Sequence, residues 1–157
     1  MTVAEISKIR EAQPGDELEL AEMMACLWPE SDMREHLSYA ENLIRTRTSG
    51  TLPGTFFVAA GGDGKLTGFI QVGLRSHADG CEPSAPVGFI EGWFVREGFR
   101  GAGTGQKLME AAESWARNLH CREMASDALL DNQLSLRAHS SAGFDVVDRC
   151  VHFRKKL

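Results

Sequence analysis

The sequence lacks the usual features of a membrane-spanning, secreted or disulfide-stabilised protein. No apolar run approaches the roughly 18 residues that a membrane helix requires. The N-terminus has no basic stretch followed by an apolar one, so we expect no secretory signal. No CxxC pair occurs, which predicts neither a zinc site nor a redox motif and fits a reducing cytoplasm. The widely spaced cysteines are Cys26, Cys81, Cys121 and Cys150.

Positive charge is also scarce. Lysine and arginine number 17 against 22 acidic residues, for a formal net charge of −5. An acidic surface disfavours unspecific binding to nucleic acid or to an anionic membrane, and it favours cationic partners. We therefore expect neither a nucleic-acid nor a membrane partner, and no histidine or cysteine spacing predicts a metal site.

The chain has enough apolar material for one core. Its 157 residues suit a single domain, and 43% hydrophobic with 25% charged residues is typical of a soluble globular protein. A core of this size needs no disulfide or metal to hold it together. The sequence contains no repeat and no low-complexity segment. We expect one domain over residues 1–157.

Four stretches have the spacing of apolar residues that is typical of helices. The first follows Asp16, a candidate N-cap, and ends near Trp28. The second follows Ser31 or Asp32, and the third follows Gly105. The fourth runs from a candidate cap at Asp131 to residue 142. The apolar stripe of the second is Met33, Leu37, Ala40 and Ile44, and that of the third is Leu108, Ala112, Trp115 and Leu119.

Shorter β-rich runs alternate with these helices and predict a mixed α/β sheet of about six strands. Two of the runs are separated by Gly61-Gly62-Asp63-Gly64, which is a hairpin signal. A long loop over residues 76–86 joins the next pair. The predicted strands with clear boundaries cover residues 55–60, 66–73, 87–95, 121–127 and 146–153.

Residues 96–105 are the stretch most suggestive of chemistry, because four glycines lie between a predicted strand and a predicted helix. Glycines let the backbone bring several N–H groups to one point at the positive end of a helix, which is how a pyrophosphate is held. The glycines are Gly98, Gly101, Gly103 and Gly105, and Arg96, Arg100 and Lys107 add positive charge.

Two familiar phosphate motifs do not fit this stretch. A P-loop needs Gly-Lys-Ser/Thr, but Gln106 separates Gly105 from Lys107. A dinucleotide fingerprint would have Gln106 or Leu108 in place of its third glycine. The remaining alternative from spacing alone is a glycine-rich helix entry whose arginines are solvated.

The run Arg100-Gly101-Ala102-Gly103-Thr104-Gly105 resembles the Arg/Gln-x-x-Gly-x-Gly/Ala acetyl-CoA motif of the GNAT superfamily of N-acetyltransferases. The context is similar too, because a strand ending in Phe94-Val95 precedes it and a helix follows. Asn132 and Gly143-Phe144 resemble the second cofactor motif. The resemblance implies an α/β (α+β), GNAT-like fold: a mixed, mostly antiparallel sheet of about six strands, splayed centrally, with helices on both faces.

Four segments are similar to aminoglycoside 6′-N-acetyltransferases within that superfamily. They are Leu27-Trp28-Pro29, Phe89-Ile90-Glu91-Gly92-Trp93-Phe94-Val95, Cys121-Arg122-Glu123-Met124-Ala125-Ser126-Asp127 and Phe153-Arg154-Lys155. This similarity implies acetyl-CoA as co-substrate, direct attack of the 6′-amine on the thioester, antibiotic resistance and a homodimer. The predicted strand 146–153 is then a candidate for pairing across subunits.

The resemblance also implies where acetyl-CoA binds, along a strand that a bulge splays from its neighbour. The pantetheine amides would pair with the backbone of Trp93, Phe94 and Val95. Asn132 would bond the cofactor near the pantetheine arm, or it is only a helix cap beside Asp131. The pyrophosphate would be held by the backbone N–H groups of Arg100, Gly101, Ala102, Gly103, Thr104 and Gly105.

Two carboxylates, Glu91 and Asp127, are the candidates for handling the amine. An aminoglycoside amine is largely protonated near neutral pH and must lose a proton before it attacks. Both side chains would also hold ammonium groups of the substrate. The alternatives are a core Glu91 carboxylate paired with a nearby arginine and an Asp127 that is a loop or cap residue. Trp28 would wall the sugar rings, or it is ordinary core packing.

One position departs from the superfamily pattern. His139 stands where many members carry a tyrosine that protonates the departing thiolate. A histidine can donate a proton, but this one can also be an ordinary helix residue. Protonation of the thiolate by solvent is an equal alternative. Two other functions stay open: a GNAT enzyme acting on another amine, such as a polyamine or a protein N-terminus, and a non-catalytic module that binds acetyl-CoA.

Overall fold

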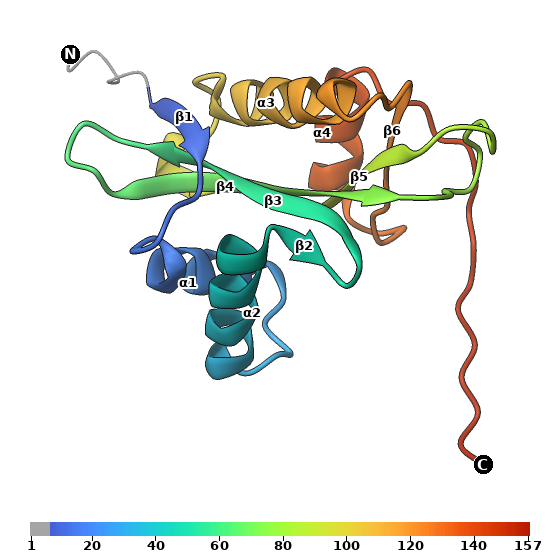
Figure 1. The fold of residues 1–157 in the computed structure, drawn as a ribbon, viewed down its shortest axis with the longest axis horizontal. Helices are drawn as coiled ribbons and strands as arrows, with labels where there is room; N and C mark the ends of the chain where they lie inside the picture. Colours follow the sequence, from blue (N-terminus) through green and yellow to red (C-terminus); the bar gives the residue numbers. More distant parts are fainter. Residues whose placement is uncertain (1–6) are drawn as a thin grey trace.

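The computed structural model describes residues 7–157, in which one sheet is covered by helices on both faces (Figure 1). The elements in chain order are β1 (Lys8–Glu11), α1 (Glu17–Leu27), α2 (Met33–Thr46), β2 (Thr48–Ser49), β3 (Leu52–Ala60), β4 (Leu66–Arg75), β5 (Val87–Val95), a 3₁₀ turn (Glu97–Phe99), α3 (Thr104–Asn118), β6 (Glu123–Ser126) and α4 (Gln133–Ser141).

Within the described residues the sheet has six strands in the order β1-β3-β4-β5-β6, with β2 beside β3. Every pair is antiparallel except β5 with β6. The predicted hairpin joins β3 to β4, and Gly64 in its turn has a φ of +82°. The left-handed conformation explains why glycine stands there. The mixed, mostly antiparallel sheet expected from the sequence is confirmed.

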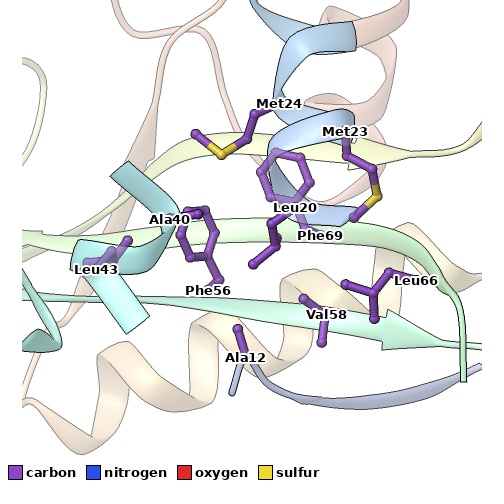
Figure 2. Close-up of a cluster of buried hydrophobic side chains, with 10 residues drawn as sticks. All are labelled: Ala12, Leu20, Met23, Met24, Ala40, Leu43, Phe56, Val58, Leu66 and Phe69. Carbon is purple, nitrogen blue, oxygen red and sulfur yellow. The ribbon is translucent and has the colours of Figure 1, made fainter. Parts of the chain in front are cut away.

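Helices α1 and α2 cover one face of the sheet and bury the first apolar cluster (Figure 2). Phe69 of β4 lies at its centre, completely buried, with its ring 5.9 Å from that of Phe56. The cluster consists of Ala12, Leu20, Met23, Met24, Ala40, Leu43, Phe56, Val58, Leu66 and Phe69.

The stripe predicted for α2 is partly wrong. Ala40 is buried, but Met33 is exposed and the other two buried positions are His36 and Leu43. His36 is accommodated because its Nε2 lies 3.0 Å from the carbonyl oxygen of Trp28, so the ring is buried with a hydrogen-bond partner. The periodicity therefore located the helix but missed its orientation by about one residue.

Helices α3 and α4 cover the opposite face and bury the second cluster. Leu108, Met109 and Ala112 of α3 pack on Ile70 and Ile90 of the sheet. Ala142 and Phe144, at the end of α4, join the edge of this cluster. Two separate cores thus clamp the central strands from both sides, which holds the sheet in place where β5 and β6 diverge.

Two predicted helix caps behave differently from expectation. Asn132, not Asp131, caps α4, because its Oδ1 accepts the N–H of Ser135 at 3.1 Å. Asp16 does occupy the N-cap position of α1, but its side chain makes no capping bond. Its carboxylate instead accepts two bonds from Arg10, at 2.6 and 2.9 Å, and one from the N–H of Gln13.

The predicted last strand, residues 146–153, is not a strand in the structure. After Phe144 the chain continues as an extended, exposed segment, which passes Gly80, where Val147 lies against it, and then leaves the body of the fold (Figure 1). A β-rich sequence forms a strand only when a neighbouring strand pairs with it, and this segment does not lie along its own sheet. Its exposed apolar side chains are Val146, Val147, Val151, Phe153 and Leu157.

The cysteines are all free thiols, as expected, although Cys26 and Cys150 are exposed rather than buried. A membrane crossing would need a longer and more apolar helix than any in the described part of the chain.

The Arg10–Asp16 pair predicts an acid-sensitive contribution to stability. Burial alone would raise the pKa of Asp16, but the bonds from Arg10 and Gln13 outweigh it and hold the pKa below its ordinary value. A lowered folded-state pKa adds stability above the unfolded pKa of about 3.9, and this stability is lost as the pH falls through the folded pKa.

We therefore expect Asp16→Asn to cost about 1–3 kcal/mol of unfolding free energy at neutral pH. The cost should shrink as the pH falls below about 4, where the native carboxylate also becomes protonated. Urea unfolding at several pH values measures both effects, with the exposed Asp131→Asn as control. A cost that stays constant with pH would contradict this account.

Candidate functional site

A β-bulge in β5 is the origin of the site. Ile90 pairs with Val72 and Gly92 pairs with Gln71, so Glu91 between them has no partner on β4. The extra residue reverses the alternation of side chains: Ile90 and Trp93, three residues apart, both pack in the cluster beneath α3. A regular strand would have placed them on opposite faces.

Strand β6 leaves β5 at the same point. The parallel pairing runs from Val87 to Ile90 and ends where Ile90 meets Ser126. Beyond this last pair, β5 continues from Glu91 to Val95 while β6 has stopped, so one backbone edge of that segment has no strand beside it within residues 7–157. An open edge of this kind can receive the amide groups of an extended ligand.

The glycine-rich loop follows directly after the open edge. Gly101 and Gly103 both have left-handed backbones, with φ of +79° and +82°, and Gly103 is the N-cap of α3. Alternating conformations of this kind turn successive N–H groups toward one side, and α3 adds the positive end of its dipole. The loop therefore has the geometry of an anion cradle, as its sequence predicts.

Two side chains tie the loop to the open edge. The indole N–H of Trp93 donates to the carbonyl of Gly105 at 3.2 Å. The Arg100 Nε–H donates to the carbonyl of Val95 at 2.8 Å. Both contacts fix the distance between the unpaired backbone and the start of α3, so one long ligand can span the two.

The two carboxylates predicted to act on an amine lie in different environments. Glu91 forms a bidentate pair with Arg75 at 2.8 and 3.0 Å, and Arg75 stacks 3.4 Å from the ring centroid of Phe89. The pairing of Glu91 with an arginine, expected as an alternative, is therefore present, although Glu91 is half-buried and not in the core. Asp127 is exposed and directly follows β6, on the other side of the opening between β5 and β6.

Trp28, at the end of α1, packs over the bulge from the opposite side of the sheet. A Cβ built on Gly92 would lie 2.5 Å from its Cη2 atom, so only glycine lets the indole approach this closely. The ring also stacks on His36, 6.4 Å between centroids, and remains half-buried. Both of its expected roles, core packing and a wall for the sugar rings, are compatible with this placement.

Residues at the start of α4 and within it lie near the point where β5 and β6 diverge, on the face of the sheet that α3 covers. The Oδ1 atom of Asn132 is used in the helix cap, and its amide group is exposed. His139 packs edge-on against Trp93 and Phe144, with centroids 5.5 and 5.3 Å away. Its Nε2 lies 2.7 Å from the hydroxyl oxygen of Ser126.

Arg75 and Ser126 are site residues that sequence reasoning did not single out. Arg75 is 16 residues from Glu91 and is brought to it by the pairing of β4 with β5. Ser126 is 13 residues from His139. It lies in the segment 121–127 that resembles the acetyltransferases, but the sequence analysis assigned it no role. Its position before Asp127 was the available signal. Within residues 7–157 no group of three or more metal-ligating side chains gathers.

Known proteins resemble this chain over nearly its whole length. Residues 17–144 match the model of the acetyltransferase (GNAT) family. A curated relative from Stenotrophomonas maltophilia, named aminoglycoside N(6′)-acetyltransferase type 1, is 36% identical over 99% of this chain and 97% of its own. A relative of the same name from Klebsiella aerogenes is 36% identical over 95% and 96%.

Solved structures agree with these relatives. AAC(6′)-Iy in complex with the bisubstrate analogue CoA-S-monomethyl-acetylneamine has a TM-score of 0.84 at 31% identity and covers 96% of this chain and 98% of its own. AAC(6′)-IG from Acinetobacter haemolyticus also has a TM-score of 0.84, at 30% identity over 96% and 99%.

The close packing of Trp28 on Gly92 predicts the effect of adding one methyl group. Gly92→Ala should lower the unfolding free energy by about 1–3 kcal/mol, because the rigid indole must move. Gly73→Ala in β4 is the matched control, since its new Cβ would meet its nearest neighbour at an ordinary 3.7 Å. Urea unfolding compares the two, and equal stabilities would show that Trp28 is not held against the bulge.

Proposed function

This chain belongs to the acetyltransferase (GNAT) family and to its aminoglycoside N(6′)-acetyltransferases, and from that premise we propose how its residues acetylate the 6′-amine of aminoglycosides. The acetyl donor is acetyl-CoA. The product is an acetylated antibiotic that no longer acts, and this inactivation gives resistance. The observation that carries the proposal is the open edge of β5, bounded by the glycine-rich loop and by two carboxylates.

Acetyl-CoA fits the open edge with its pantetheine arm extended beside β5. The backbone of Trp93, Phe94 and Val95 would pair with the pantetheine amides by strand addition. The N–H groups from Arg100 through Gly101, Ala102, Gly103 and Thr104 to Gly105 would bind the pyrophosphate. The exposed amide of Asn132 would donate to the arm, because its cap uses only the oxygen. The thioester then lies near the bulge.

The polycationic substrate would enter between Trp28 and the splayed strand ends. The indole offers an apolar wall for the sugar rings, while Asp127 and Glu91 attract ammonium groups. The Arg75–Glu91 pair is partly exposed, so it contributes only about 0–1 kcal/mol and a substrate ammonium can replace Arg75. Asp127 is the freer carboxylate and would take the proton that the 6′-ammonium loses.

Attack by the neutral amine on the thioester carbonyl forms a tetrahedral intermediate. When this intermediate collapses, coenzyme A is released as a thiol. A backbone N–H at the bulge would stabilise the oxyanion that forms. We place the enzyme in the cytoplasm, where its four free thiols remain reduced.

The exposed C-terminal segment supports a homodimer. Residues 145–157 carry β-prone apolar side chains that do not pair with their own sheet, and β6 has a free outer edge. The partner is a second copy of this chain, and residues 146–153 of each copy would pair along the sheet of the other. The single domain would then include all 157 residues, its last strand being completed only in the dimer.

The proposed reaction predicts one product. Incubation with acetyl-CoA and kanamycin or tobramycin should release coenzyme A and add one acetyl group, which fragmentation mass spectrometry should locate on the 6′-nitrogen. Asp127→Asn should lower kcat strongly and leave the affinity for coenzyme A unchanged, because Asp127 handles the amine and not the cofactor. Asp63→Asn, an exposed change in the turn between β3 and β4 and outside the site, is the control.

Several outcomes would count against the proposal. Absence of turnover above background with every aminoglycoside would refute the substrate class. A polyamine or peptide N-terminus preferred by more than about tenfold in kcat/KM would make the resistance role secondary. Equal loss of turnover and of coenzyme A affinity in Asp127→Asn would deny that residue its role.

The dimer predicts a mass and its dependence on the C-terminal segment. Sedimentation equilibrium of the full chain should give twice the mass of one chain. Val151→Asp with Phe153→Asp should shift the equilibrium toward monomer, because charged side chains oppose burial of this segment. Substituting the terminal Leu157→Asp, outside the paired range, is the control. A full chain that stays monomeric, or a double variant that stays fully dimeric, would exclude this pairing.

A further inference from the structure

Acetylation of an ammonium group requires two proton movements, and the carboxylates account for only one. The first proton leaves the ammonium before attack. After attack the nitrogen is positively charged again, and it must lose a second proton. Meanwhile the carbon–sulfur bond breaks and the thiolate gains a proton. A side chain that lies near both the nitrogen and the sulfur can accept this proton and return it to sulfur faster than solvent does.

Ser126 and His139 have the geometry for such a transfer. The Nε2 atom of His139 lies 2.7 Å from the hydroxyl oxygen of Ser126, which is the last residue of β6 and pairs with Ile90 where the strands diverge. On the other side of the ring, Nδ1 lies 2.8 Å from the carbonyl oxygen of Ser135. Enzymes that activate a hydroxyl commonly hydrogen-bond it to a histidine whose other nitrogen is held by an acceptor.

The carbonyl of Ser135 determines the tautomer of the ring. The hydroxyl oxygen of Ser135 also lies near Nδ1, at 3.2 Å, but the carbonyl oxygen is closer and can only accept a hydrogen bond. We therefore assign the proton of the neutral ring to Nδ1 and the free lone pair to Nε2. The hydroxyl of Ser126 therefore donates to Nε2. The neutral pair is thus ready to accept a proton through the serine oxygen.

The same contacts suit the protonated ring. A histidine that has gained a proton on Nε2 donates to the serine oxygen, and the serine hydroxyl is released to donate elsewhere. In the structure a second acceptor, the carbonyl of Ile90, lies 3.3 Å from the hydroxyl oxygen. Both protonation states therefore have satisfied hydrogen bonds without any movement of the backbone.

We propose that Ser126 and His139 form a proton shuttle, which carries the second proton from the attacking nitrogen to the sulfur of coenzyme A. Ser126 is the catalytic residue, because its hydroxyl meets the reacting atoms, and His139 acts through it. The inference rests on the proposed function, since the thioester must lie at the splay. Trp93 and Phe144 pack edge-on against the imidazole and hold the ring toward Ser126.

The step balances in protons and electrons. The carbon–nitrogen bond has formed and its nitrogen is cationic. A proton passes from that nitrogen to the serine oxygen while the serine proton passes to Nε2 of His139. The oxyanion then re-forms the carbonyl and the carbon–sulfur bond breaks. The thiolate takes the serine proton, and His139 returns its proton to Ser126, which restores the starting state.

The test uses Ser126→Ala, His139→Gln and His139→Ala in the full chain. We expect kcat to fall by about 10²-fold in each, a usual size for general acid–base catalysis. KM for both substrates and the dissociation constant of coenzyme A, measured by calorimetry, should change little. Added imidazole should restore part of the turnover of His139→Ala but none of Ser126→Ala, because imidazole replaces the ring and not the hydroxyl.

Ser140→Ala and His120→Asn are the matched controls, because they change the same two residue types at exposed positions and neither side chain is hydrogen-bonded to Ser126 or His139. Variants that keep wild-type kcat would overturn the shuttle. So would a loss of kcat accompanied by an equal loss of coenzyme A affinity, or a loss in His139→Ala that imidazole does not relieve. Absence of turnover in the unchanged chain would instead refute the proposed function, and the shuttle with it.

Discussion

The site depends on the early divergence of two parallel strands. β6 pairs with β5 for four residues and stops at Ser126, while β5 continues past the bulge at Glu91. A sheet usually leaves a free edge only at its border, where it must be protected from other chains. Here the free edge lies inside the fold, beside the N-terminus of α3, and it is kept open because each strand is anchored by packing on both faces.

That packing separates the tasks of the two faces. The cluster around Phe69 anchors α1 and α2, and it brings Trp28 against Gly92. The cluster beneath α3 anchors Trp93, whose indole N–H reaches the carbonyl of Gly105. The bulge makes this division possible, because it turns Trp93 toward α3 although regular alternation would turn it away. The substrate side and the cofactor side of one strand are thus organised by different cores.

Electrostatics then distinguish chemically similar groups. Glu91 and Asp127 each directly follow the last paired residue of their strand, β5 and β6 respectively. Glu91 is paired with Arg75, whereas Asp127 is exposed. Ser126, between the strand and Asp127, is linked to His139, whose second nitrogen is committed to a backbone carbonyl. The two carboxylates and the hydroxyl–imidazole pair, to which we assign the two proton transfers, therefore lie at the same divergence of the strands.

The sequence alone determined the features that depend on local conformation. Glycine spacing in residues 96–105 predicted the loop before α3 as a candidate anion cradle, a largely apolar run predicted β5 with the bounds that it has, and the hairpin at Gly61–Gly64 followed from turn chemistry. The resemblance to acetyltransferases supplied Glu91, Asp127 and Trp28 as candidates. Tertiary structure decided the rest, because it depends on residues far apart in the chain. Pairing of β4 with β5 placed Arg75 on Glu91, docking of α4 placed His139 on Ser126, and His36 turned α2 by one position. Residues 146–153 have a strand's composition without a strand's pairing, since backbone hydrogen bonds need a neighbour that composition cannot provide.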